Sequence, residues 1–250
     1  MEEREALERL AEEVYRAYLA LPGIPEGRVE PERLARELLG LRIVCRRLSP
    51  GGALLGLTAA SPVGVPVWND AGQLCHYYLD GRTVLLDPAL FSPWASPGRC
   101  RFTLMHEVSH LLLARRRPET GPARSCLCRA EERRADALAA ALLMPRPLLA
   151  RRLPELGFPA PRQYLDPRLD PESWGRFGAL AEALGVSRQA LGIRLKQLGL
   201  SVREPGRRSP PDVLMDEEDY AVLEGNACRN TTQKSRTRPD TPGPWRSRAG

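Results

Sequence analysis

The stretch Leu104-Met105-His106-Glu107-Val108-Ser109-His110-Leu111-Leu112-Leu113 decides how the centre of this chain folds. It places H-E-x-x-H inside an apolar run that favours a helix. Residues four apart share one face of an α-helix, so His106 and His110 can present two imidazole nitrogens to one metal ion. Glu107 lies one step around the helix, where it can reach a metal-bound water. The pattern predicts a catalytic zinc site.

A simpler interpretation is a surface helix that happens to carry two histidines four residues apart. The neighbouring positions oppose it, because they are mostly apolar and predict a buried helix. Buried imidazole and carboxylate groups without partners are costly, and a metal ion would supply a partner for all three.

A second helix is expected at residues 130–145, where an alanine- and leucine-rich run ends at Pro145. Glu132 and Asp136 lie one turn apart on its apolar face. We assign Glu132 as the third zinc ligand. Asp136 would accept a hydrogen bond from the non-ligating nitrogen of a zinc-bound histidine. The alternatives are a solvated charged turn at residues 131–134, and His76 as the third ligand.

These two segments resemble one family. RFTLMHEVSHLLL (101–113), followed by ERRADALAAALLMP (132–145), is similar to the ImmA/IrrE family of bacterial metallopeptidases. The resemblance implies a gluzincin-like, zinc-dependent peptidase domain that cleaves a DNA-binding transcriptional repressor in a stress or DNA-damage response. Carried over by position, it implies His106, His110 and Glu132 as ligands and Glu107 as general base. Leu138 departs from the family pattern, which often has an aromatic residue there.

In the expected mechanism, zinc lowers the pKa of its bound water toward about 7. Glu107 takes the proton and later passes it to the leaving amine. Mn²⁺ is the alternative metal. An oxyanion donor is also needed, and the sequence leaves four candidates open: His76, Tyr77, Tyr78 and Tyr164.

Composition places the chain among cytoplasmic proteins. It has 250 residues and no stretch of about 18 apolar residues, so no membrane partner is expected. Its charged start lacks the apolar core of a signal peptide. The six cysteines are therefore expected as reduced thiols. Cys126-x-Cys128 is read as incidental, with a redox or metal-sensing pair as the alternative.

The positive charge of the chain is concentrated at its end. The formal net charge is +6, and residues 226–250 hold six basic residues and one acid, a net charge of +5. That leaves +1 for the first 225 residues, which weakens the suggestion of nucleic-acid binding.

The fold class expected is α+β, with a peptidase domain at residues 1–150. Helices are expected at 2–20 and about 31–40, and strands at 41–48, 53–58, 73–79 and 83–86. Asp80-Gly81 predicts a hairpin between the last two strands. The small sheet should pack beside the H-E-x-x-H helix, and the stretch between His110 and Glu132 should be a surface loop.

A helix-turn-helix-like domain is expected in residues 151–204, and the prolines from Pro145 to Pro161 mark a linker region before its helices. Its turn lies at Gly185 and its second helix is capped by Ser187. Arg188, Gln189 and Arg194 on that helix are candidates for docking DNA or substrate. The alternative is a helical corner that packs on the peptidase domain. Residues 205–250 are expected to be a disordered polar tail.

Two rival functions remain open at this level. The first is a DNA-binding transcriptional regulator whose metal site is structural or sensory. The second is an inactive scaffold that binds the repressor without cutting it. An intact Glu107 argues against the scaffold, and the finding of three ligands rather than four argues against a structural zinc site.

Overall fold

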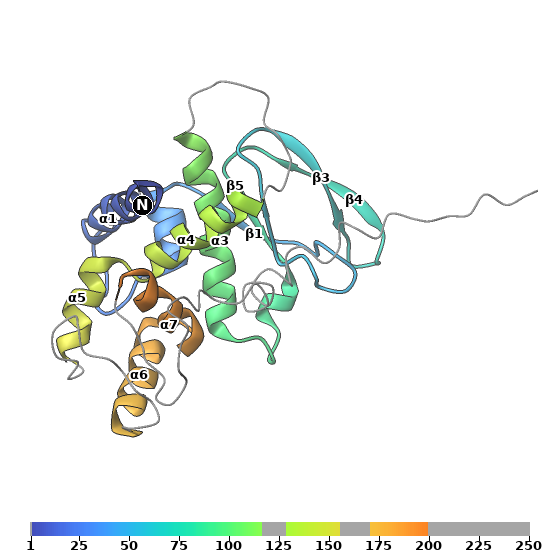
Figure 1. Cartoon of the computed structure of the whole chain (residues 1–250). Coiled ribbons are helices and arrows are strands. Elements are labelled where there is room, and N and C mark those ends of the chain that lie inside the picture. Colours follow the sequence, from blue (N-terminus) through green and yellow to red (C-terminus); the bar gives the residue numbers. More distant parts are fainter. Residues whose placement is uncertain (1, 117–128, 156–170, 200–250) are drawn as a thin grey trace, which may run out of the picture.

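The computed structural model describes residues 2–116, 129–155 and 171–199 of the chain. Figure 1 shows the H-E-x-x-H helix α3 passing through the middle of the molecule, with most other helices on one side and the strands on the other. The helical elements, in chain order, are α1 (Glu2–Leu19), α2 (Pro31–Arg33), the π-helix η1 (Leu34–Leu38), the 3-10 helix η2 (Pro88–Phe91), α3 (Pro97–Arg115), α4 (Arg129–Leu143), α5 (Arg146–Glu155), α6 (Pro171–Leu184) and α7 (Arg188–Gln197).

The N-terminal helices follow the sequence pattern closely. α1 buries the side expected from its apolar spacing, and it packs on α4. The predicted helix at 31–40 forms as α2 and η1. It begins at Pro31, whose fixed φ suits the first turn, and the chain leaves it at Gly40, where φ is +63°.

The strands form two small sheets. β5 (Thr83–Leu86) is buried along its whole length, between β1 (Arg42–Cys45) and β2 (Gly56–Thr58). β1 runs parallel to β5, with Arg42 opposite Thr83, and β2 runs antiparallel, with Gly56 opposite Leu86. β2 is an edge strand, and both β2 and β5 pack against α3. The expectation of a small sheet beside that helix is confirmed.

The hairpin expected at Asp80-Gly81 is wrong. β4 (Leu74–Leu79) pairs instead with β3 (Val63–Trp68), and the two form a separate sheet. The reason is that β1 and β2 occupy both edges of β5. Asp80 stabilises a change of direction, since its carboxylate accepts hydrogen bonds from the Arg82 amide and the Thr83 hydroxyl.

β3 was missed because Pro66 interrupts its apolar run, and proline has no amide to donate to a neighbouring strand. The structure tolerates Pro66 because β3 has only one full partner strand, β4. The turn between them is held by Asn69, whose side-chain oxygen accepts from the Gln73 amide, and by Gly72 at a φ of +73°.

The proline-rich linker expected from Pro145 is also wrong in part. Residues 146–155 form α5, which packs on α1 and buries Leu148 and Leu149. Pro147 lies in the first turn, where no amide is needed, so the helix accepts it. Residues 117–128, 156–170 and 200–250, which include most of the expected loop and the expected tail, lie outside the described residues.

The helical corner formed by α6 and α7 has the predicted geometry. Gly185 makes the turn at a φ of +67°, and the Ser187 side chain accepts a hydrogen bond from the Ala190 amide. The apolar sides of both helices belong to the same hydrophobic core as α1, α3 and α4. In the described residues, the corner therefore packs against the other helices of this core.

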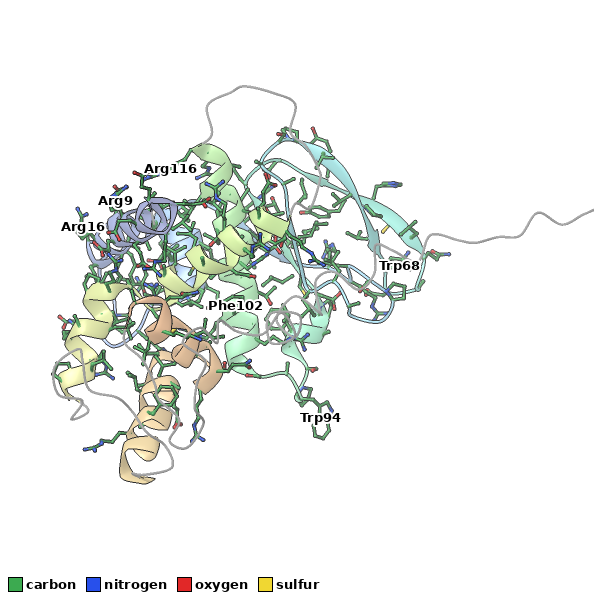
Figure 2. All side chains as sticks on the ribbon, viewed as in Figure 1. Arg9, Arg16, Trp68, Trp94, Phe102 and Arg116 are labelled. Carbon is green, nitrogen blue, oxygen red and sulfur yellow. The ribbon has the colours of Figure 1, made fainter. Side chains whose placement is uncertain are left out.

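Among the described residues, several large hydrophobic side chains are exposed, and Trp94 is the most exposed of them. Trp94 is 95% exposed, and Figure 2 shows it projecting away from the body of the molecule. Across the described part of the chain, none of the helices combines the length and apolar character needed to cross a membrane.

Candidate metal centre

Two helices supply the predicted site. His106, Glu107 and His110 lie on α3, and Glu132 and Asp136 lie on α4. α3 and α4 pack against each other, and small residues of α4, among them Ala135 and Ala139, are buried. Close packing of two helix faces brings the i,i+4 pair of α3 opposite the i,i+4 pair of α4.

The three proposed ligands converge. His106 Nε2 lies 3.0 Å from His110 Nε2 and 3.2 Å from a Glu132 carboxylate oxygen. The other Glu132 oxygen lies 3.5 Å from His110 Nε2. One ligand atom from each residue falls within 4.8 Å of the others, so this group could hold one metal ion. Two imidazoles and one carboxylate are a donor set that suits zinc and leaves a coordination position for water.

Asp136 completes the arrangement behind the histidine. Its Oδ1 lies 2.7 Å from His106 Nδ1, on the side of the ring away from Glu132. This contact orients the ring and favours the tautomer that has its proton on Nδ1. Nε2 is then left to bind a metal. The residue is where the sequence placed it, one turn beyond Glu132.

The metal-free electrostatics show how strongly this cluster favours a cation. Burial lowers the pKa of His106, but hydrogen bonds to Asp136 and Glu132 outweigh it and raise the pKa to about 10. Burial raises the pKa of Glu132, and the hydrogen bonds from His106 and His110 outweigh that effect, so its pKa falls to about 2. The carboxylates around His106 therefore stabilise a positive charge at this place, which a divalent metal ion would supply.

Glu107 is the buried acid of the cluster. Burial raises its pKa, partly offset by the nearby His106 and His110. A carboxylate with a raised pKa can accept a proton from water and return it within one reaction cycle. Phe102, one turn before His106, lies with its ring centroid 6.4 Å from that of His106 and appears at the centre of Figure 2.

Among the described residues, the structure does not bring the alternative ligand His76 into this group. His76 is exposed on β4 and is absent from the cluster. Tyr78 is 66% exposed on the same strand. Tyr164, Cys126 and Cys128 lie outside the described residues.

Of the three docking candidates on α7, Arg188 and Gln189 are exposed but Arg194 is buried. The expectation that Arg194 contacts DNA or substrate is therefore corrected. Its guanidinium donates to both Glu8 carboxylate oxygens and to the Met144 carbonyl. The sequence suggested that Arg194 lies on the surface, because an arginine is rarely buried without a charged partner. Glu8, which is distant in the sequence, is that partner.

Sequence reasoning missed two residues near the site. Gly56 of β2 lies directly against the Glu107 side chain. Arg101 joins α3 to the rest of the fold, since it forms an ion pair with Glu30 and donates to the Leu184 carbonyl at the end of α6. The available signal for Gly56 was a glycine inside a strand, which often marks a close approach of another group.

The fold and site define a mixed α+β domain with the metal-binding geometry of a metallopeptidase. In a comparison with protein-family models, residues 90–196 match the IrrE N-terminal-like domain, Peptidase_M78. This match supports the resemblance to the ImmA/IrrE family of metallopeptidases that the two motifs indicated. The match includes the five residues proposed for the metal site, which are His106, Glu107, His110, Glu132 and Asp136. No curated protein matches the chain.

Proposed function

We propose that this protein is a cytoplasmic zinc-dependent endopeptidase that hydrolyses one peptide bond of a DNA-binding transcriptional repressor and so controls gene expression under stress. The observation that carries the peptidase proposal is the convergence of His106, His110 and Glu132 within 4.8 Å, with buried Glu107 beside them. The repressor and the stress response rest on the ImmA/IrrE resemblance.

The group fits a hydrolytic zinc site better than a structural zinc site. Structural zinc sites are normally closed by four protein ligands, whereas hydrolytic sites use three and leave a position for water. Among the described residues, the cluster comprises three. The contact between Asp136 and His106 is the kind of support that ligating histidines need to stay oriented.

The residues of the site have separate roles in the proposed reaction. A zinc ion, when bound, acidifies a water molecule and polarises the scissile carbonyl. Glu107 accepts the proton of the attacking water, and then donates it to the amine of the leaving peptide. Its burial supports both steps because the raised pKa brings the carboxyl nearer to neutral pH. His106, His110 and Glu132 hold the ion, and Asp136 keeps the His106 ring in place.

The alternative function, a DNA-binding regulator with a structural or sensory metal, is less well supported. It relied on three residues of α7, and the burial of Arg194 removes one of them from the surface. Arg188 and Gln189 remain exposed. Duplex binding that weakens with salt and fails in Arg188→Ala would be the evidence for it.

The test combines metal content with cleavage. The proteins are wild type, Glu107→Gln, Glu132→Ala and the matched control Glu131→Ala, whose residue is the neighbour of Glu132 outside the cluster. Elemental analysis should find about one zinc per chain in all but Glu132→Ala. Cleavage is assayed on a quenched fluorogenic peptide library and on β-casein.

We expect cleavage by wild type and Glu131→Ala, and none by Glu107→Gln although it keeps its zinc. Cleavage by Glu107→Gln would overturn the assignment of the base. Zinc retained by Glu132→Ala would overturn the ligand set. A zinc-loaded wild type that cleaves no probe, and no repressor purified from the same cells, would overturn the peptidase proposal.

A further inference from the structure

Gly56 lies on strand β2, which packs against helix α3. If a Cβ were added at this position, it would stand 2.6 Å from Oε1 and 2.8 Å from Cγ of Glu107, and 2.9 Å from Cγ2 of Thr103. These distances are below any normal contact between carbon and a heavy atom. The strand backbone therefore touches the Glu107 side chain, and only a hydrogen fits between them.

The need for glycine here is not conformational. Gly56 is absent from the glycines with positive φ, so its backbone would accept any L-residue. Gly185 differs, because it has a φ of +67° as well as a close neighbour, the Arg101 guanidinium. At Gly56 the only demand is the close approach of Glu107 and Thr103, a recognised use of glycine within a strand.

Thr103 and Glu107 lie one turn apart on α3, so both face β2. The Gly56 backbone packs between their side chains, and Glu107 is buried there. The strand and the Thr103 methyl thus form a wall on one side of the carboxylate. Glu107 also interacts electrostatically with His106, His110 and Glu132.

We propose that Gly56 is a positioning residue, which sets the place of the Glu107 carboxylate relative to the metal ligands by letting the β2 backbone contact it directly. The proposal rests on the proposed function, because it assigns Glu107 as general base. It adds a residue from the sheet to a site otherwise built by two helices.

The geometry predicts that Gly56→Ala folds normally but has a displaced Glu107 carboxylate. The atoms that must move are side-chain atoms of Glu107 and Thr103, not backbone. The three atoms nearest to the added Cβ belong to Glu107 and Thr103 and not to a metal ligand, so zinc content should stay near one per chain. A displacement of about 1 Å at a catalytic group typically lowers the rate about 10²-fold.

Gly64 supplies the matched control. It lies in β3, also within a strand, and an added Cβ there meets nothing within 4 Å. Wild type, Gly56→Ala and Gly64→Ala are compared by zinc content, by kcat and KM on the best-cleaved peptide of the fluorogenic library, and by crystal structures of the zinc-loaded proteins.

We expect Gly56→Ala to keep its zinc and to lose about 10²-fold in kcat with KM changed less than about threefold, because the loss concerns a proton-transfer group. Its crystal structure should show the Glu107 carboxylate displaced, and Gly64→Ala should match wild type in every measurement. Wild-type kcat in Gly56→Ala, or loss of zinc from it, overturns the proposal. If the wild type cleaves no probe, the proposed function fails separately, and an undisplaced Glu107 carboxylate in the Gly56→Ala crystal structure still overturns this one.

Discussion

The buried ion pair between α7 and α1 gives the sharpest stability prediction. Arg194 is 1% exposed and Glu8 is 3% exposed. The Arg194 guanidinium donates to both Glu8 oxygens, one at 2.7 Å, and to the Met144 carbonyl at 3.0 Å. Arg194→Ala removes all of these bonds and leaves the Glu8 carboxylate buried.

Breaking a buried pair by removing one partner costs about 3–5 kcal/mol of unfolding free energy. Arg146 moderates the loss, because its Nε lies 3.4 Å from Glu8 and remains. We therefore expect about 3 kcal/mol, the low end of that range. Glu8→Leu combined with Arg194→Met should recover most of it, since well-packed apolar pairs of similar volume commonly replace buried ion pairs without loss.

The assay is urea denaturation at neutral pH, with the midpoint and slope giving the free energy of unfolding. The control is Arg151→Ala, which breaks a pair between Arg151 and Glu26 whose side chains are 39% and 81% exposed. That variant should lose less than about 1 kcal/mol. If Arg194→Ala loses no more than Arg151→Ala, the inference that the buried Arg194–Glu8 pair stabilises the fold is wrong.

Three further outcomes are expected. Gly185→Ala should lower the free energy of unfolding by about 1–3 kcal/mol in the same assay, because alanine is strained at a φ of +67° and its Cβ would stand 2.8 Å from Arg101 Nε; a change within error would refute it. Asp136→Asn should weaken zinc binding about 10- to 100-fold in a chelator competition, because the carboxylate at 2.7 Å from His106 Nδ1 is lost; unchanged affinity would count against its role. Zinc binding at pH 8 should release about one proton per ion, because the pKa of His106 without metal is about 10 and a histidine ligand must be neutral. The affinity for zinc should therefore rise with pH up to about that value. Calorimetry in buffers of different ionisation enthalpy measures the proton release, and a binding heat that does not depend on the buffer would contradict it.

The local parts of the site could be read from the sequence. His106 and His110 lie four residues apart in an apolar run, as do Glu132 and Asp136 in an alanine-rich one. Helical periodicity alone puts each pair on one face, and buried polar groups on such faces need a common partner. The same reasoning placed α1 and the turn at Gly185, where the signals are also local.

Other features depended on contacts between distant segments. Asp80-Gly81 has the composition of a hairpin, yet β5 pairs with β1 and β2, because a strand buried throughout needs partners on both edges. The prolines after Met144 suggested a linker, yet α5 forms because α1 offers an apolar surface for Leu148 and Leu149.

The sequence by itself determined which side chains share a helix face, and with them the proposed ligands, the proposed base and the proposed supporting residue Asp136. Only the tertiary structure decided that Arg194 is buried against Glu8, and that the backbone of Gly56 touches Glu107. The physical reason is distance along the chain. Periodicity acts over a few residues, whereas these contacts join segments 186 and 51 positions apart, and their geometry exists only once the helices and the sheet have packed.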